Sequence, residues 1–207
     1  MPDELDAHTL VQFHDAALAS PGWPQAGGRA PSGGPWQALH ANHRYNSLRW
    51  REEDKAQPAS DVGVHDIAGL SKRLIDRYQQ LRGDAVEAID EAILEQLAEV
   101  AHGDAARMSS ETPGAMADRL SILSLKIFHM RAQTLRMDAD AMHIDACTRK
   151  LRRLVAQRQD LAACLDQLLS EARAGLAYFK VYLQFTLYGD PALNPSLCAT
   201  PAASAAP

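Results

Sequence analysis

The stretch that decides the fold is Ser109-Ser-Glu-Thr-Pro-Gly-Ala-Met-Ala-Asp-Arg-Leu-Ser-Ile-Leu-Ser-Leu-Lys-Ile-Phe-His-Met130. Thr112 is a typical helix cap, and Pro113 suits the first helical position, where its missing N–H costs nothing. After Pro113, apolar residues fall on nearly every side of a cylinder that turns about 100° per residue. The pattern therefore predicts a helix that is surrounded by other helices.

Charged residues on this crowded helix raise a question that the sequence leaves open. Asp118, Arg119, Lys126 and His129 are expected to have little solvated surface. Burying a charge is costly unless it is paired. The four residues therefore indicate either an internal ion-pair network or a binding site.

Helical periodicity recurs along most of the chain, and no alternating strand pattern interrupts it. We expect an all-α fold, an antiparallel helical bundle of about four long helices plus a short N-terminal helix. The expected helices cover residues 5–19, 36–56, 64–100, 113–137 and 141 to about 188, the last with a break near Gly175, and Gly83 is expected to mark a kink or a close helix approach. The expected organisation is a short helix with a Pro/Gly-rich linker (1–35), the bundle (36–198) and a disordered tail (199–207).

Composition narrows the class of protein. A chain of 207 residues is long enough for one sizeable core, and a formal net charge of −5 argues against a nucleic-acid binder. Three cysteines without metal-ligand spacing are expected to be small buried hydrophobes in a reducing compartment. Since no apolar stretch approaches ~20 residues, we expect no membrane span and a cytoplasmic location.

One face of the helix predicted at 36–56 mixes residue types that suit a polar ligand. His43, Asn46, Trp50 and Glu53 share this face, and Asp54 borders it. Trp50 could stack on a sugar or base while Glu53 accepts hydroxyl hydrogen bonds. The alternative is a partly exposed face whose polar groups pair with neighbouring helices.

The helix predicted at 64–100 carries a polar arc opposite its apolar stripe. This arc contains Lys72, Arg73, Asp76, Gln80, Gly83, Glu87 and Asp90. It is either a solvated face or, if it faces Glu53 and Asp54, one wall of an interior site.

Carboxylates from neighbouring helices can hold Mg²⁺ or Mn²⁺, which could bridge to a substrate phosphate. The available ligands are Glu53, Asp54, Asp76, Glu111 and Asp118. No P-loop or nucleophile elbow occurs, so covalent catalysis has no support in the sequence.

Three segments together resemble the domain-of-unknown-function 4254 family of bacterial proteins. They run from Asn46 to Asp90, from Ser110 to Met130, and from Phe179 to Pro195. The resemblance implies an all-helical protein that is often encoded near glycosyltransferases of lipopolysaccharide or other surface-glycan synthesis. It implies no established reaction.

We therefore expect an accessory or ligand-binding protein of surface-glycan synthesis that holds a phosphorylated or nucleotide-linked sugar. Arg73, Arg119 and Lys126 would meet phosphate, and Trp50, Asn46 and Glu53 the sugar. One alternative is a phosphohydrolase or transferase that uses Mg²⁺ or Mn²⁺, the only cofactors considered. Another is a scaffold that docks a glycosyltransferase or forms a homodimer. The sequence leaves open whether the protein is an enzyme.

Overall fold

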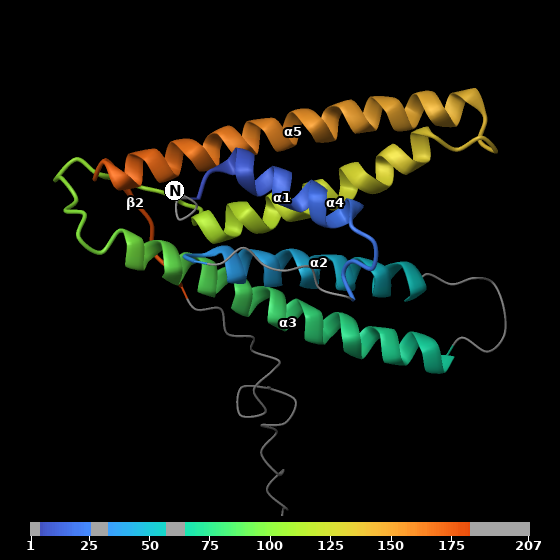
Figure 1. Cartoon of the computed structure of the whole chain (residues 1–207), viewed down its shortest axis with the longest axis horizontal. Helices are drawn as coiled ribbons and strands as arrows, with labels where there is room; N and C mark the ends of the chain where they lie inside the picture. The colour runs from blue at the N-terminus through green and yellow to red at the C-terminus, as the bar shows by residue number, and fades with distance from the viewer. Residues whose placement is uncertain (1–4, 26–32, 57–64, 183–207) are drawn as a thin grey trace, which may run out of the picture.

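The computed structural model describes residues 5–25, 33–56 and 65–182, and this part of the chain is a bundle of α-helices (Figure 1). Its elements are α1 (Ala7–Ala19), α2 (Trp36–Ala56), α3 (His65–Gln96), β1 (Arg107–Met108), α4 (Pro113–Thr134), α5 (Ala141–Arg173) and β2 (Ala177–Tyr178). Two antiparallel hairpins, α2–α3 and α4–α5, lie against each other, and α1 packs on α4 and α5. The predicted all-α bundle is confirmed.

Helix α4 begins as its sequence predicts. The Thr112 side chain caps it by accepting a hydrogen bond from the N–H of Ala115 at 3.2 Å, and Pro113 takes the first helical position. The helix contacts α1, α2, α3 and α5, so it is the central helix of the bundle. Leu120 and Ile127 are fully buried within it.

The hydrophobic core joins both hairpins to α1. Leu10 of α1, Leu39 of α2, Ile89 of α3 and Leu165 of α5 are all buried in one cluster with Leu120. Because each helix contributes one apolar stripe to this cluster, burial of the stripes holds the helices together.

The stretch after α1 is more than a surface linker. Trp23 and Pro24 are buried, and the Trp23 indole donates a hydrogen bond to the Ser47 hydroxyl on α2 at 3.0 Å. The described part of the predicted linker therefore contributes to the core.

The close approach expected at Gly83 occurs instead at Gly114. Helix α3 continues through Gly83, where an added Cβ would meet nothing within 4 Å. A Cβ at Gly114 would lie 2.5 Å from the carbonyl oxygen of Val86. A glycine at residue 114 therefore lets α3 and α4 meet closely.

The end of α5 differs from the prediction. The helix ends at Arg173, Gly175 takes a positive φ of 69°, and β2 then pairs in parallel with β1. These strands have two residues each, which is too short to leave a periodic signal in the sequence. Helices α3 and α4 also end earlier than predicted, at Gln96 and Thr134.

Several sequence predictions concern residues that the structure describes only in part. Cys147 is buried as expected, but Cys164 is exposed. Cys198, residues 183–195 of the third family-like segment and the tail at 199–207 lie outside the described residues.

Within the described residues, none of the helices combines the length and apolar character needed to cross a bilayer.

Candidate functional site

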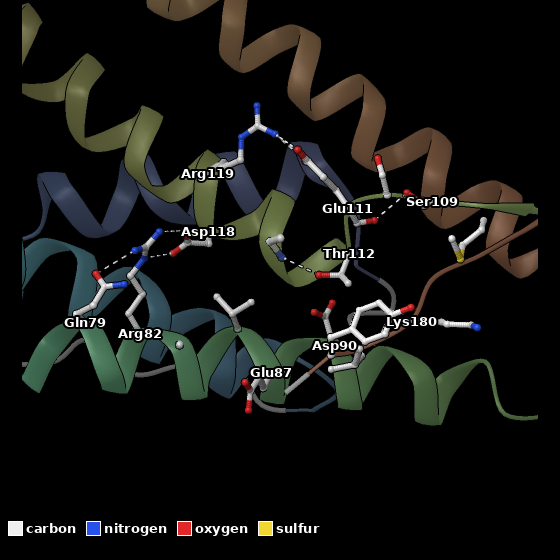
Figure 2. Close-up of a pocket in the computed structure, with 17 residues that line it drawn as sticks. Gln79, Arg82, Glu87, Asp90, Ser109, Glu111, Thr112, Asp118, Arg119 and Lys180 are labelled. Carbon is white, nitrogen blue, oxygen red and sulfur yellow. Dashed lines mark hydrogen bonds and ion pairs between the residues drawn. The ribbon is translucent and has the colours of Figure 1, made fainter. Parts of the chain in front are cut away.

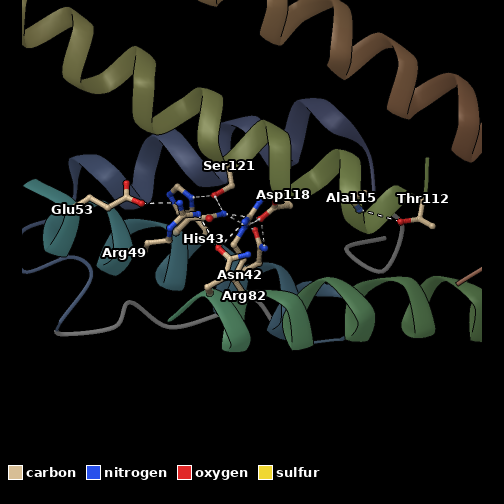
Figure 3. Close-up of polar contacts among 11 residues, drawn as sticks. Asn42, His43, Arg49, Glu53, Arg82, Thr112, Ala115, Asp118 and Ser121 are labelled. Carbon is tan, nitrogen blue, oxygen red and sulfur yellow. Dashed lines mark hydrogen bonds and ion pairs between the residues drawn. The ribbon is translucent and has the colours of Figure 1, made fainter. Parts of the chain in front are cut away.

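A polar cluster lies at the centre of the bundle, where α2, α3 and α4 meet (Figure 3). Its hub is the carboxylate of Asp118, whose Oδ1 accepts hydrogen bonds from Arg82 Nε at 2.7 Å, Asn42 at 2.8 Å and Asn46 at 3.0 Å. A second Arg82 nitrogen binds Oδ2. Burial raises the pKa of Asp118, but the hydrogen bonds from Arg82 and Asn42 outweigh it and lower the pKa below its ordinary value. The carboxylate is therefore held ionised.

The cluster continues one turn along α4 to Ser121. Its hydroxyl accepts a hydrogen bond from Asn46 at 3.0 Å and is hydrogen-bonded to Nδ1 of His43 at 2.8 Å. Three predicted residues, His43, Asn46 and Asp118, are thus brought together. We define the polar cluster as these three residues with Asn42, Arg82 and Ser121.

The sequence interpretation missed the other three members of the polar cluster. Asn42 lies one helical turn before Asn46, and Ser121 lies three residues after Asp118, so both share a face with a predicted residue. Those spacings were a usable signal. Arg82 comes from a different helix, and no local pattern in the sequence paired it with Asp118.

A cavity of about 510 Å³ opens beside the polar cluster, between α3 and the N-terminal part of α4 (Figure 2). We call it the α3–α4 cavity. Arg82 and Asp118 line one end, and Asp90, Glu111 and Arg119 line other parts of its wall. The segment before α4 and residues 180–182 complete the wall.

The charges in the α3–α4 cavity are largely paired with one another. Arg82 binds Asp118, and Arg119 donates to both carboxylate oxygens of Glu111 at 2.6 Å. Asp90 is buried and accepts a hydrogen bond from the N–H of Gly114 at 2.6 Å. Burial raises the pKa of Asp90 to about 6, against the opposing effect of Thr112 and Gly114. Asp90 can therefore exchange a proton near neutral pH.

A second cavity, of about 640 Å³, lies between the C-terminal part of α2 and the α4–α5 hairpin. We call it the Trp50 cleft. Its wall contains the indole of Trp50 stacked on the imidazole of His129, with ring centroids 4.8 Å apart and planes 7° from parallel. Burial lowers the pKa of His129, and nearby Asp54 opposes this effect. The stacked rings therefore form an aromatic wall next to a carboxylate.

Basic side chains line the rest of the Trp50 cleft. They are Lys126 on α4 and Lys150 and Arg153 on α5. Within the part of the chain that the structure describes, none of the three makes an ion pair. With Asp54 as the only carboxylate among the lining residues, the cleft is positively charged.

The sequence model described as "Protein of unknown function (DUF4254)" matches residues 36–181. The chain belongs to the DUF4254 family. No curated protein and no solved structure matches it. The matched range contains α2 to α5, and with them the polar cluster and every residue that lines the Trp50 cleft. Helix α1 lies outside it.

In the DUF4254 domain the predicted site residues lie in several separate places, among them two cavities and the surface of α3. Glu111, Asp118 and Arg119 line the α3–α4 cavity, whereas Trp50, Asp54 and Lys126 line the Trp50 cleft. Arg119 and Lys126 are exposed, so the expectation that they have little solvated surface is wrong. Their long side chains reach solvent from the edge of α4.

Other predicted residues lie apart from both cavities. Glu53 pairs with Arg49 at 2.7 Å, and the Gln80 side chain donates to Asp84 at 2.8 Å. Arg73 and Asp76 are exposed on α3. Half of the polar arc on α3 is therefore a solvated face, and only its C-terminal part, with Glu87 and Asp90, reaches a cavity.

The five carboxylates considered as metal ligands do not gather. Three of them are paired with arginines, namely Glu53, Glu111 and Asp118. Among the described residues, no group of three or more His, Cys, Asp or Glu side chains is arranged to hold a metal ion. The geometry of the described residues therefore offers no carboxylate cluster from which a metal-dependent reaction could be derived.

Proposed function

We propose that this DUF4254 protein binds a phosphorylated or nucleotide-linked sugar in the Trp50 cleft, as a non-catalytic accessory protein. The observation that carries the proposal is the parallel stack of Trp50 on His129 beside three basic side chains that form no ion pair with any residue in the described ranges. A nucleotide sugar offers the matching chemistry, because it joins flat rings to a strongly anionic phosphate group.

The stacked wall suits a ring. Aromatic faces bind bases and the apolar faces of sugars, and stacking of one base on an aromatic side chain contributes about 1–3 kcal/mol. Trp50 is only half-buried, so the indole is accessible from the cleft. Its partner His129 holds the indole in place at a centroid distance of 4.8 Å.

The basic side chains suit a phosphate. Lys126 on α4 and Lys150 and Arg153 on α5 line the same cleft, so a phosphate in it would meet positive charge from two helices. An arginine can bind phosphate oxygens in pairs, whereas lysines act as point charges. Asp54 and Gln157 line the same cleft and can accept or donate hydrogen bonds to sugar hydroxyls.

The α3–α4 cavity is the poorer phosphate site. Its arginines are already bound to Asp118 and Glu111, and Asp90 adds a further carboxylate. A phosphate there would have to displace an existing partner or lie next to a carboxylate. We therefore assign the anionic ligand to the Trp50 cleft.

The proposed setting is bacterial surface-glycan synthesis in the cytoplasm. Support for this setting comes from the family resemblance alone, and the cleft is compatible with it because donors in glycan synthesis are phosphorylated sugars. Docking to a glycosyltransferase stays a prediction of the same kind.

Isothermal titration of the full chain with UDP-glucose, UDP, glucose 1-phosphate and inorganic phosphate tests the proposal. We expect Trp50→Leu to weaken UDP-glucose binding by about 5- to 150-fold, since it removes the stacking surface. The double variant Lys150→Gln with Arg153→Gln should weaken the binding of every phosphate-containing ligand and reduce the salt dependence of binding. Both residues are exposed, so folding should be unaffected.

Arg73→Gln is the matched control for charge. Arg73 is exposed on α3 and lines none of the cavities described above, so its loss should leave the affinity unchanged. The proposal would be contradicted if the Lys150/Arg153 double variant bound these ligands as tightly as the natural chain does. It would also be contradicted if Arg73→Gln weakened binding as much as the double variant. The absence of binding for all four compounds would contradict it as well.

A further inference from the structure

The α3–α4 cavity contains hydrogen-bonding groups that the described residues leave unused. Arg119 donates to Glu111 through only one of its terminal nitrogens. Neither the Ser110 hydroxyl nor the Lys180 ammonium group has a hydrogen-bond partner among the described residues, although both line the cavity. Donors and acceptors from separate segments of the chain thus line a space of about 510 Å³.

An anion is a poor match for this space. The N-terminus of α4 would be the natural anion-binding element, but its N–H groups are already used. Gly114 donates to Asp90 and Ala115 donates to Thr112, and Pro113 has no N–H. A carboxylate of the protein therefore occupies the place that an anion would take.

The arrangement of charges favours a ligand without net charge. The ion pairs Arg82–Asp118 and Arg119–Glu111 each cancel, yet Arg119 retains N–H groups that can donate. A hydroxyl group both donates and accepts, so several hydroxyls on one molecule can use mixed donors and acceptors without breaking either pair. Val86, Ala115 and Val181 add apolar surface for the carbon skeleton of such a molecule.

We propose that the α3–α4 cavity binds a neutral polyhydroxylated molecule of the size of a mono- or disaccharide. Its volume lies in the range of small-molecule sites, about 300–1,000 Å³. In this arrangement Arg119, Ser110 and Lys180 donate to ligand oxygens, and Asp90 accepts from a ligand hydroxyl. The site is separate from the Trp50 cleft, and the inference does not depend on what that cleft binds.

Gly83 offers a way to block the cavity without disturbing the fold. It lines the cavity, and a Cβ there would meet no atom within 4 Å. Gly83→Leu therefore places a side chain in open space on a helix that tolerates leucine well. Gly83→Ala is the matched control, because it changes the backbone in the same way but fills little of the cavity.

The test is titration of the full chain and its variants with a panel of neutral sugars at up to 10 mM, including glucose, galactose, mannose, sucrose and lactose. We expect at least one sugar to bind, Gly83→Leu to weaken that binding at least tenfold, and Gly83→Ala and Trp50→Leu to leave it within about twofold. Thermal melting of each variant confirms that it is folded.

Two results would overturn the proposal. The first is that no sugar of the panel binds, or that binding survives in Gly83→Leu. The second is that inorganic phosphate or glucose 1-phosphate binds more tightly than neutral sugars and is the ligand that Gly83→Leu displaces. Loss of UDP-glucose binding in Trp50→Leu alone would concern only the other cleft, so failures of the two proposals are distinguishable.

Discussion

The carboxylate of Asp90 on α3 accepts a hydrogen bond from the backbone N–H of Gly114 on α4 at 2.6 Å. This contact satisfies one of the N–H groups that the first turn of a helix leaves without a partner. A Cβ on residue 114 would lie 2.8 Å from Cγ of Asp90 and 2.5 Å from the Val86 carbonyl oxygen. The hydrogen bond and the close helix contact therefore both depend on glycine.

Gly114→Ala should destabilise the protein. The new methyl group would collide with the backbone of Val86, which cannot rotate away as a side chain can. Overpacking of this kind costs about 1–3 kcal/mol of unfolding free energy, which is a drop of about 2–12 °C in Tm for a chain of this length. Calorimetric melting measures it.

Gly83→Ala is the opposite case on the facing helix. It adds a methyl group in open space, so we expect an unchanged or slightly raised Tm. The higher helix propensity of alanine can raise the free energy of unfolding by up to about 1 kcal/mol. If both alanine variants melted alike, the close contact at Gly114 would have no energetic role.

The bundle was predictable because its strongest signals are local. Trp36 to Ala56 is helical with the bounds predicted, and Thr112 and Pro113 mark the start of α4 through capping chemistry that involves neighbours in sequence. The close approach that we expected as one possibility at Gly83 occurs at Gly114 instead, because the two glycines face different neighbours. That difference belongs to the tertiary contact and has no counterpart in the adjacent sequence.

Asp118→Ala should cost far more stability than Glu111→Ala. The side chain of Asp118 is 6% exposed and its partner Arg82 20%, so the variant leaves a guanidinium group without its carboxylate in the interior. Removing one partner of a buried pair costs about 3–5 kcal/mol. Glu111 and Arg119 form an exposed pair, whose loss costs at most about 1 kcal/mol.

Urea unfolding of both variants measures the difference. The double variant Arg82→Met with Asp118→Leu removes both charges, and it should recover part of the stability lost in Asp118→Ala. If Asp118→Ala and Glu111→Ala were equally mild, Asp118 would not be the hub of the polar cluster.

The candidate site was predictable only in part, for a related reason. Periodicity placed His43 and Asn46 on one face of α2 and marked Asp118 as a charge on a crowded helix, and these three do meet. The contact of Asp118 with Arg82 depends on how the two hairpins dock. Pairing of α4 with α5 places Lys126, Lys150 and Arg153 around one cleft, so the basic side of the Trp50 cleft could not be predicted from either helix alone.

His14 and His43 should make the protein sensitive to acid. Their rings are buried with centroids 4.4 Å apart, and neither nitrogen of His14 has a hydrogen-bond partner among the described residues. Burial lowers the pKa of His14 well below 6.5 and the pKa of His43 to about 3. The folded state therefore excludes protons that the unfolded state binds.

The lowered pKa values of the two histidines in the folded state determine how stability changes with pH. Above pH 6.5 both histidines are neutral in either state, and their full contribution to stability is present. As the pH falls below 6.5, each histidine reduces stability by up to about 1.4 kcal/mol per pH unit. His14→Leu, which introduces an apolar side chain of similar size, should lessen the loss between pH 6.5 and 4.5. An unchanged acid response in this variant would contradict the prediction.

Ionisation of Asp90 should lower the stability of the folded protein as the pH rises, over part of the same pH range. Its pKa is raised from 3.8 in the unfolded chain to about 6 in the folded protein, chiefly by burial. The stability that this raised pKa contributes is fully present below pH 3.8 and is lost as the pH rises through 6. Asp90→Asn cannot ionise, but its side-chain oxygen can still accept the N–H of Gly114.

The stability of Asp90→Asn relative to the natural protein should therefore rise between pH 4 and pH 8. The expected rise is on the order of 2–3 kcal/mol, from a pKa difference of about two units at about 1.4 kcal/mol each. Urea unfolding of both proteins across this range isolates the effect, because the histidine contributions are common to both and cancel. A pH-independent difference would show that Asp90 ionises as readily in the folded protein as in the unfolded chain.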